Sequence, residues 1–143
     1  MEGFSIIGTD AALSKSIFRK SMNFQKKHLI GGYDVQARIE IKSGRFQVTS
    51  IFYVSTGEVY ELYEHLKICN QNLIGLVEFA RYEKALKLSI EHTTLGHVTI
   101  SGIFQDADNQ LKFEFDSDET FMSNTLIELE RLVKKYGDMK GVF

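Results

Sequence analysis

The chain has 143 residues, of which 43% are hydrophobic and 25% charged, a balance that is typical of one folded domain and excludes a disordered or fibrous protein. No apolar run is long enough to cross a membrane, and the first nine residues lack the features of a secretory signal, so we expect a cytoplasmic protein without a membrane partner. The net charge is −2 and the 17 basic residues are scattered, which argues against a nucleic-acid partner and is too small an acidic excess to indicate a basic one.

The first thirty residues have the least regular pattern. Residues 3–8 and 17–24 carry apolar anchors and are predicted as strands at the edge of a sheet, whereas residues 9–15 show little periodicity. The chain contains no proline and no Gly/Ser-rich linker. We therefore expect residues 1–143 to form a single domain.

Two alternating segments follow. Residues 33–42 place Tyr33, Val35, Ala37, Ile39 and Ile41 on one side and polar or charged residues on the other, which is the period of a half-buried strand. The dipeptide Ser43-Gly44 predicts a turn, and the alternation resumes over residues 46–54. These residues predict an antiparallel hairpin.

The period then changes to that of a helix, predicted over residues 56–70. Ser55 and Glu58 have the spacing of a capping box, and Tyr60 and Tyr63 are interpreted as core residues rather than as the lining of a ligand site. The single cysteine, Cys69, has no partner for an internal disulfide and is interpreted as an inert, partly buried thiol.

Four further strands are predicted over residues 76–82, 85–92, 97–105 and 110–116. The turns between them are too short for parallel crossovers, so the strands form an antiparallel meander. A last helix over residues 118–136 has Ser117 or Asp118 as its N-cap. The predicted fold class is α+β, with a largely antiparallel, meander-type sheet on which the two helices pack.

No common catalytic or nucleotide-binding motif occurs in the chain, so we expect neither catalysis nor a cofactor. His92 and His97 flank a predicted turn and are weak candidates for a divalent metal site with Glu91, if the two imidazoles face each other. Two ligands seldom make a protein metal site, and a solvated turn is the alternative interpretation. The acidic residues between 106 and 119 lack the calcium-loop pattern and are interpreted as turn, strand-surface and helix-start charges.

Residues 32–137 resemble the WapI-like immunity proteins of bacterial polymorphic and contact-dependent growth inhibition toxin systems. The resemblance rests on the order of the segments YDVQARIEI, EVYELYEHL, LKLSIE, GHVTISGIF and LKFEFDSDETF. Residues 96–121 are its most characteristic part. Glu119 stands where the resemblance leads us to expect glutamine, so no partner contacts are carried over from the family.

The resemblance implies a cytoplasmic protein that binds a cognate toxin domain and neutralises it by stoichiometric complex formation. Residues Ile51, Tyr53, Tyr82 and Ile103 have the parity opposite to the core sets and are predicted contacts on a free sheet face, unless the N-terminal segment covers them. Two alternatives remain open: a small-ligand or metal-binding domain that uses His92 and His97, and a homo-oligomeric adaptor, for example a homodimer, that pairs through the apolar sheet face.

Overall fold

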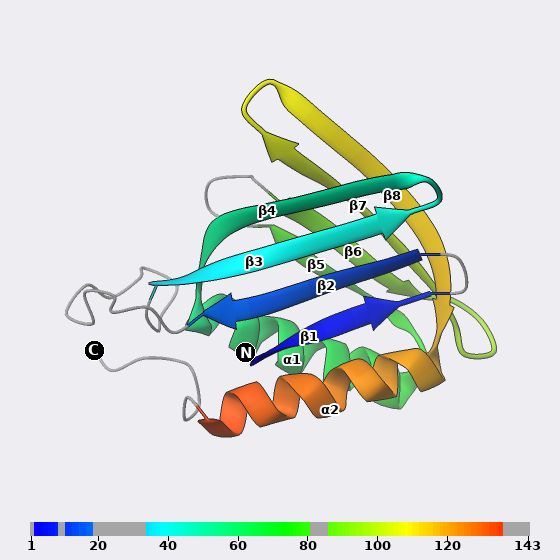
Figure 1. Cartoon of the computed structure of the whole chain (residues 1–143). Coiled ribbons are helices and arrows are strands. Elements are labelled where there is room, and N and C mark those ends of the chain that lie inside the picture. The colour runs from blue at the N-terminus through cyan, green and yellow to red at the C-terminus, as the bar shows by residue number, and fades with distance from the viewer. Residues whose placement is uncertain (1, 9–10, 19–33, 81–85, 136–143) are drawn as a thin grey trace.

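The structure is a computed structural model that describes residues 2–8, 11–18, 34–80 and 86–135. In these ranges the chain forms two successive units, each of four antiparallel strands followed by a helix (Figure 1). The first unit contains β1 (Glu2–Ile7), β2 (Ala11–Phe18), β3 (Asp34–Ser43), β4 (Phe46–Ser55) and α1 (Thr56–Asn72). The second contains β5 (Gly75–Ala80), β6 (Leu86–His92), β7 (His97–Asp106), β8 (Asn109–Asp118) and α2 (Glu119–Lys135). The predicted α+β class and antiparallel meander are confirmed.

The strands are divided between two sheets, whereas the sequence pattern was interpreted as one. The first sheet has the order β1-β2-β3-β4 and the second has the order β5-β6-β7-β8, so that each is a meander. Helix α1 follows β4 directly and connects the first sheet to the second, in which β5 pairs with β6. Alternation identifies the buried side of a strand but not the strand beside it, which is why the pattern did not separate the sheets.

The N-terminal segment contains one predicted strand and one that was not predicted in full. The first strand lies where it was predicted, whereas β2, at Ala11–Phe18, covers residues 11–15 that show little periodicity and only the first two residues of the strand predicted over 17–24. Residues 19–33 are outside the described part of the chain. Strand β2 pairs with both β1 and β3 and is therefore an interior strand rather than the predicted edge strand, while β1 and β4 form the two edges of this sheet. The sequence AALSKSIF alternates weakly, so pairing on both sides, rather than its own pattern, determines that it is a strand.

Helix α1 begins with the predicted capping box. The backbone N–H of Glu58 donates to Ser55 Oγ (3.0 Å), and the backbone N–H of Ser55 donates to Glu58 Oε1 (2.9 Å). Tyr60 and Tyr63 are partly buried and pack against the core, as predicted. The helix ends at a left-handed residue, Leu73, whose φ is 56°.

Helix α2 uses Asp118 as its N-cap, because Asp118 Oδ1 accepts a 2.9 Å hydrogen bond from the backbone N–H of Phe121. Its buried residues recur at helical spacing: Met122, Thr125, Leu129 and Leu132. Of these residues, Met122 has no exposed surface.

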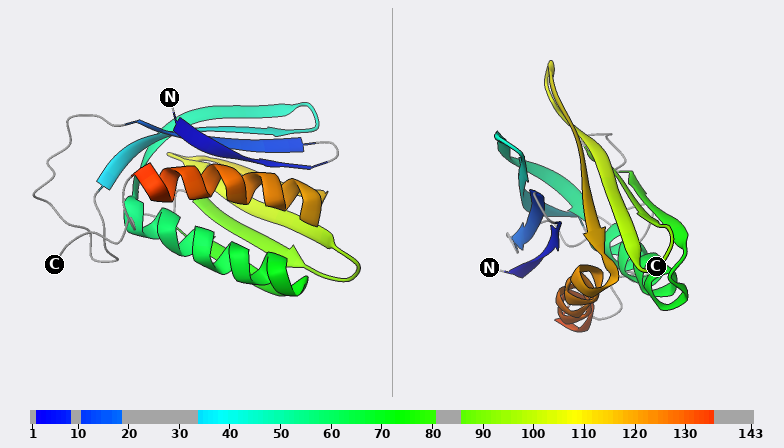
Figure 2. Two further views of the ribbon diagram at one scale, coloured as in Figure 1. Left: turned by 90° about the horizontal axis from the view of Figure 1, so that it is seen from below. Right: turned by 90° about the vertical axis from the view of Figure 1, so that its right-hand side faces the viewer.

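The core lies between the two sheets and the helices. Ile39 and Ile41 from the first sheet and Ile90 and Ile100 from the second have no exposed surface and belong to one cluster of buried residues. Figure 2 shows the sheets as two layers, with α1 and α2 side by side along one edge of them. Each sheet therefore has an inner face toward the core and an outer face away from it.

The free edge of β1 is closed by side chains from the second unit. Ser117 Oγ donates to the carbonyl of Ile7, and Thr125 Oγ1 donates to the carbonyl of Ser5, both at 2.6 Å. The backbone N–H of Ser5 donates to Glu128 Oε1 (3.0 Å). These bonds satisfy polar groups that an edge strand would otherwise leave open to another chain.

Candidate partner-binding face

The outer face of the second sheet carries side chains in rows, because cross-strand register places partners directly opposite each other. From one end of the sheet to the other, the rows on β6, β7 and β8 are Lys87-Ile103-Lys112, Ser89-Ser101-Glu114 and Glu91-Thr99-Asp116. All of these side chains are exposed or half-buried. On strand β5, Glu78 and Leu76 extend the second and third rows.

A shallow hollow with a volume of about 430 Å³ lies in the first two rows. Ser89 and Ser101, with their short side chains, line this hollow, and Ile103 forms part of its wall. Gly102 cannot be larger without a local shift, because a Cβ there would lie 2.5 Å from both the Lys87 carbonyl oxygen and the Phe113 ring.

The predicted contact residues do not form one patch. Ile51 lies on the outer face of the first sheet, 56% exposed and opposite Arg38, and Tyr53 follows it on β4. Ile103 lies on the outer face of the second sheet, and Tyr82 is outside the described residues. Both outer faces point away from the shared core, so the division into two sheets separates Ile51 from Ile103.

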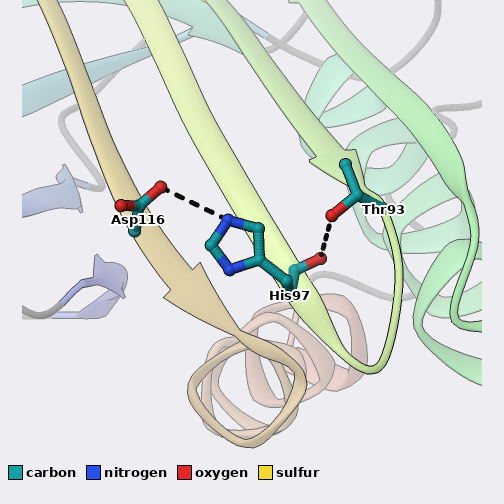
Figure 3. Close-up of polar contacts among 3 residues, drawn as sticks. All are labelled: Thr93, His97 and Asp116. Atoms are coloured by element: carbon teal, nitrogen blue, oxygen red, sulfur yellow. Dashed lines mark hydrogen bonds and ion pairs between the residues drawn. The ribbon is translucent and has the colours of Figure 1, made fainter.

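The two candidate metal ligands lie on opposite faces of the second sheet. His92 pairs with Val98 in the register of β6 and β7, and His97, one residue earlier, therefore points the other way. His92 is 2% exposed, on the core side. His97 is exposed, and its Nε2 lies 3.4 Å from Asp116 Oδ1 (Figure 3). The imidazoles do not face each other, because the register pairs His92 with Val98 and not with His97.

His92 belongs to a polar network between the helices. Its Nε2 lies 3.1 Å from Asn70 Oδ1, the Asn70 amide donates to Ser123 Oγ (3.2 Å), and the Ser123 hydroxyl donates to the carbonyl of Glu119 (2.9 Å). The amide oxygen accepts, so Nε2 carries the proton, and the buried Nδ1 has no hydrogen-bond partner. Burial lowers the pKa of His92, although the Glu119 carboxylate acts in the opposite direction. The neutral imidazole thus links β6 to the two helices.

In the described ranges, no three His, Cys, Asp or Glu side chains are arranged to hold a metal ion. Cys69 is partly buried, and desolvation raises the pKa of its thiol, which lowers the fraction of reactive thiolate. Neither described helix has the length and hydropathy needed to span a membrane.

Comparison of the sequence with models of known protein families identifies the family of this chain. The model of the immunity protein WapI-like family matches residues 18–137. The chain belongs to the WapI-like immunity family. This membership confirms the resemblance seen in the sequence. The match includes β3, β4, α1 and the whole second unit, and it begins at the last residue of β2.

Among curated proteins, no sequence matches the chain. Its fold is similar to the crystal structure of WHY3 from Arabidopsis thaliana, with a TM-score of 0.54 and 11% identity over 95% of this chain and 88% of that one. A structure of the plant transcriptional regulator PBF-2 aligns with a TM-score of 0.49 and 15% identity, over 94% of this chain and 80% of that one. At such low identity, the likeness to WHY3 concerns the fold alone.

Proposed function

We propose that this protein binds a cognate bacterial toxin domain and neutralises it by forming a stoichiometric complex in the cytoplasm of the cell that makes the toxin. The observation that carries the proposal is its membership of the WapI-like immunity family over residues 18–137. Neutralisation of this kind requires binding and no catalysis.

The two outer sheet faces support the proposal as contact surfaces. Each outer face belongs to a sheet whose inner face packs in the shared core, so the backbone of its strands has a fixed geometry before a partner binds. A preorganised surface loses less conformational entropy on binding than a loop does. Ile51 and Ile103 remain proposed contacts, each for the face on which it lies, because one partner surface covers only one of two faces that point away from a shared core.

Co-expression with a toxin domain tests the proposal. The first step is to read the frame immediately upstream of this chain's gene and, if it encodes a large secreted protein with a variable end domain, to take that domain for the experiment. We expect the domain alone to stop growth, and co-expression to restore growth and yield a one-to-one complex on purification. Continued growth arrest in cells that contain folded, soluble immunity protein would contradict the proposal.

The alternative functions have separate tests. A shared metal at His92 and His97 gains no support from imidazoles on opposite faces of the sheet, and addition of zinc, nickel or calcium is expected to leave the melting temperature unchanged. A homodimer through an outer sheet face would appear as a mass that rises with concentration in light scattering.

A further inference from the structure

Five of the six carboxylates in the strands of the second sheet lie on its outer face, although the whole chain is nearly neutral. The group comprises Glu78, Glu91, Glu114, Asp116 and Asp118. Between them, the register places the uncharged Ser89, Ser101 and Thr99, so that no lysine or arginine interrupts these rows. Charged residues that are scattered in the sequence thus lie on one face of the sheet, because alternate residues of β6 and β8 point to the same side.

Among the described residues, the charge of this face is not balanced. Glu78, Glu91 and Glu114 form no ion pair with any described residue, and Asp116 is paired only with His97, which is charged only when protonated. Lys87 and Lys112 lie in the adjoining row, about 7 Å further along the strands. Five carboxylates and two lysines leave a charge of −3 on this face, against −2 for the chain.

The first sheet has no such imbalance on its outer face. Between Gln36 and Ser43 of β3, the charges on this face are Arg38, Glu40 and Lys42, and Lys42 Nζ lies 3.3 Å from Glu40 Oε1. Opposite them on β4 stand Gln47, Thr49 and Ile51. A basic partner is therefore attracted to the second sheet rather than to the first.

We propose that the outer face of the second sheet is the docking surface for a basic surface of the toxin domain, an inference that rests on the function proposed above. The carboxylate rows attract the partner's lysines and arginines. The hollow beside Ile103 admits a side chain at the border of the contact. The Lys87-Lys112 row repels a basic group placed over it and so sets the orientation of the partner.

Matched charge reversals test this assignment. Glu114→Lys on β8 and Glu40→Lys on β3 change the total charge of the protein equally, and each replaces one strand residue on an outer face. In calorimetric titrations with the toxin domain, we expect Glu114→Lys to weaken binding at least tenfold and Glu40→Lys to change it less than threefold. Binding of the unaltered protein should weaken as salt rises from 50 to 500 mM, because the attraction is screened.

Carboxylate labelling of the complex provides a test without substitutions. Carbodiimide-activated coupling, followed by mass spectrometry, should show Glu91 and Glu114 protected by the toxin domain while Glu40 stays reactive. Absence of any complex with the unaltered protein would refute the proposed function itself. A complex in which Glu40→Lys weakens binding as much as Glu114→Lys, or in which Glu91 and Glu114 remain reactive, would overturn the docking surface alone.

Discussion

At the scale of single residues, His92 shows how burial sets the chemistry of a side chain. Its Nε2–H is held by Asn70, but its buried Nδ1 has no acceptor for a second proton. Protonation would place a charge in the core side of the sheet, and the nearby Glu119 carboxylate offsets this only in part. The folded state therefore favours the neutral imidazole.

Stability should consequently fall in mild acid. Because the folded pKa of His92 is below the ordinary value of about 6.5, the unfolded chain binds its proton first, and the free energy of unfolding decreases as the pH drops from about 6.5 through the folded pKa. Urea unfolding between pH 5 and 8 measures this slope. We expect His92→Gln to flatten it, since glutamine still donates to Asn70 without titrating, and His97→Gln to retain it. An equal slope in His92→Gln would assign the effect to other groups.

Gly102 is a second position where the environment of one residue decides its identity. Substitution by alanine would bring Cβ against the Lys87 carbonyl oxygen and the Phe113 ring. We expect Gly102→Ala to lower the free energy of unfolding by about 1–3 kcal/mol in denaturant titrations, as overpacking does. Ser101→Ala, on the adjacent outer-face position, should change it by less than about 0.5 kcal/mol. Equal stabilities would show that the neighbours shift without cost.

At the scale of elements, side chains of α2 hydrogen-bond to the open edge of β1, as the backbone of a neighbouring strand would. Thr125 and Glu128 on the helix and Ser117 on β8 bond to the backbone of β1 along its open edge. This contact joins the first strand of the chain to the last helix. It also leaves the β1 edge less able to pair with another chain.

Removal of the Thr125 hydroxyl tests the importance of this contact. The side chain is 1% exposed, and Thr125→Val keeps its shape but leaves the Ser5 carbonyl without this donor. We expect a loss of about 1–3 kcal/mol in the free energy of unfolding. Asn124→Ala, on the exposed side of the same turn, serves as the control. A stability of Thr125→Val within error of the unaltered protein would mean that the edge does not depend on this bond.

At the scale of the whole molecule, one buried cluster includes residues of both sheets and both helices. We therefore propose that the two units unfold together as a single domain. Ile39→Ala and Ile100→Ala, one in each sheet, should each cost about 2–5 kcal/mol. Native-state hydrogen exchange should show lower protection in both β3 and β7 for either variant. Loss of protection confined to the substituted sheet would indicate two independent units.

Local patterns predicted the elements of this fold well where they were strong. The alternation around Ile39 and the Ser55-Glu58 capping box placed a strand and a helix start that the structure confirms. Prediction failed at β2, whose residues alternate weakly. Parity also put Ile51 and Ile103 on one sheet face and left open whether His92 and His97 face each other, because strand parity alone does not specify register or which sheet a strand joins.

The sequence by itself determined the strands from residue 34 onward, the two helices and the antiparallel connections, because periodicity, caps and short turns act within a few residues of the chain. The order of these segments also carried the resemblance that the family match confirms. Only the tertiary structure decided that there are two sheets, that His92 is buried while His97 is exposed, and that the carboxylates gather on one outer face. These features depend on backbone hydrogen bonds and burial between segments that are distant in sequence. The net charge and the spacing of residues along the chain do not predict such contacts.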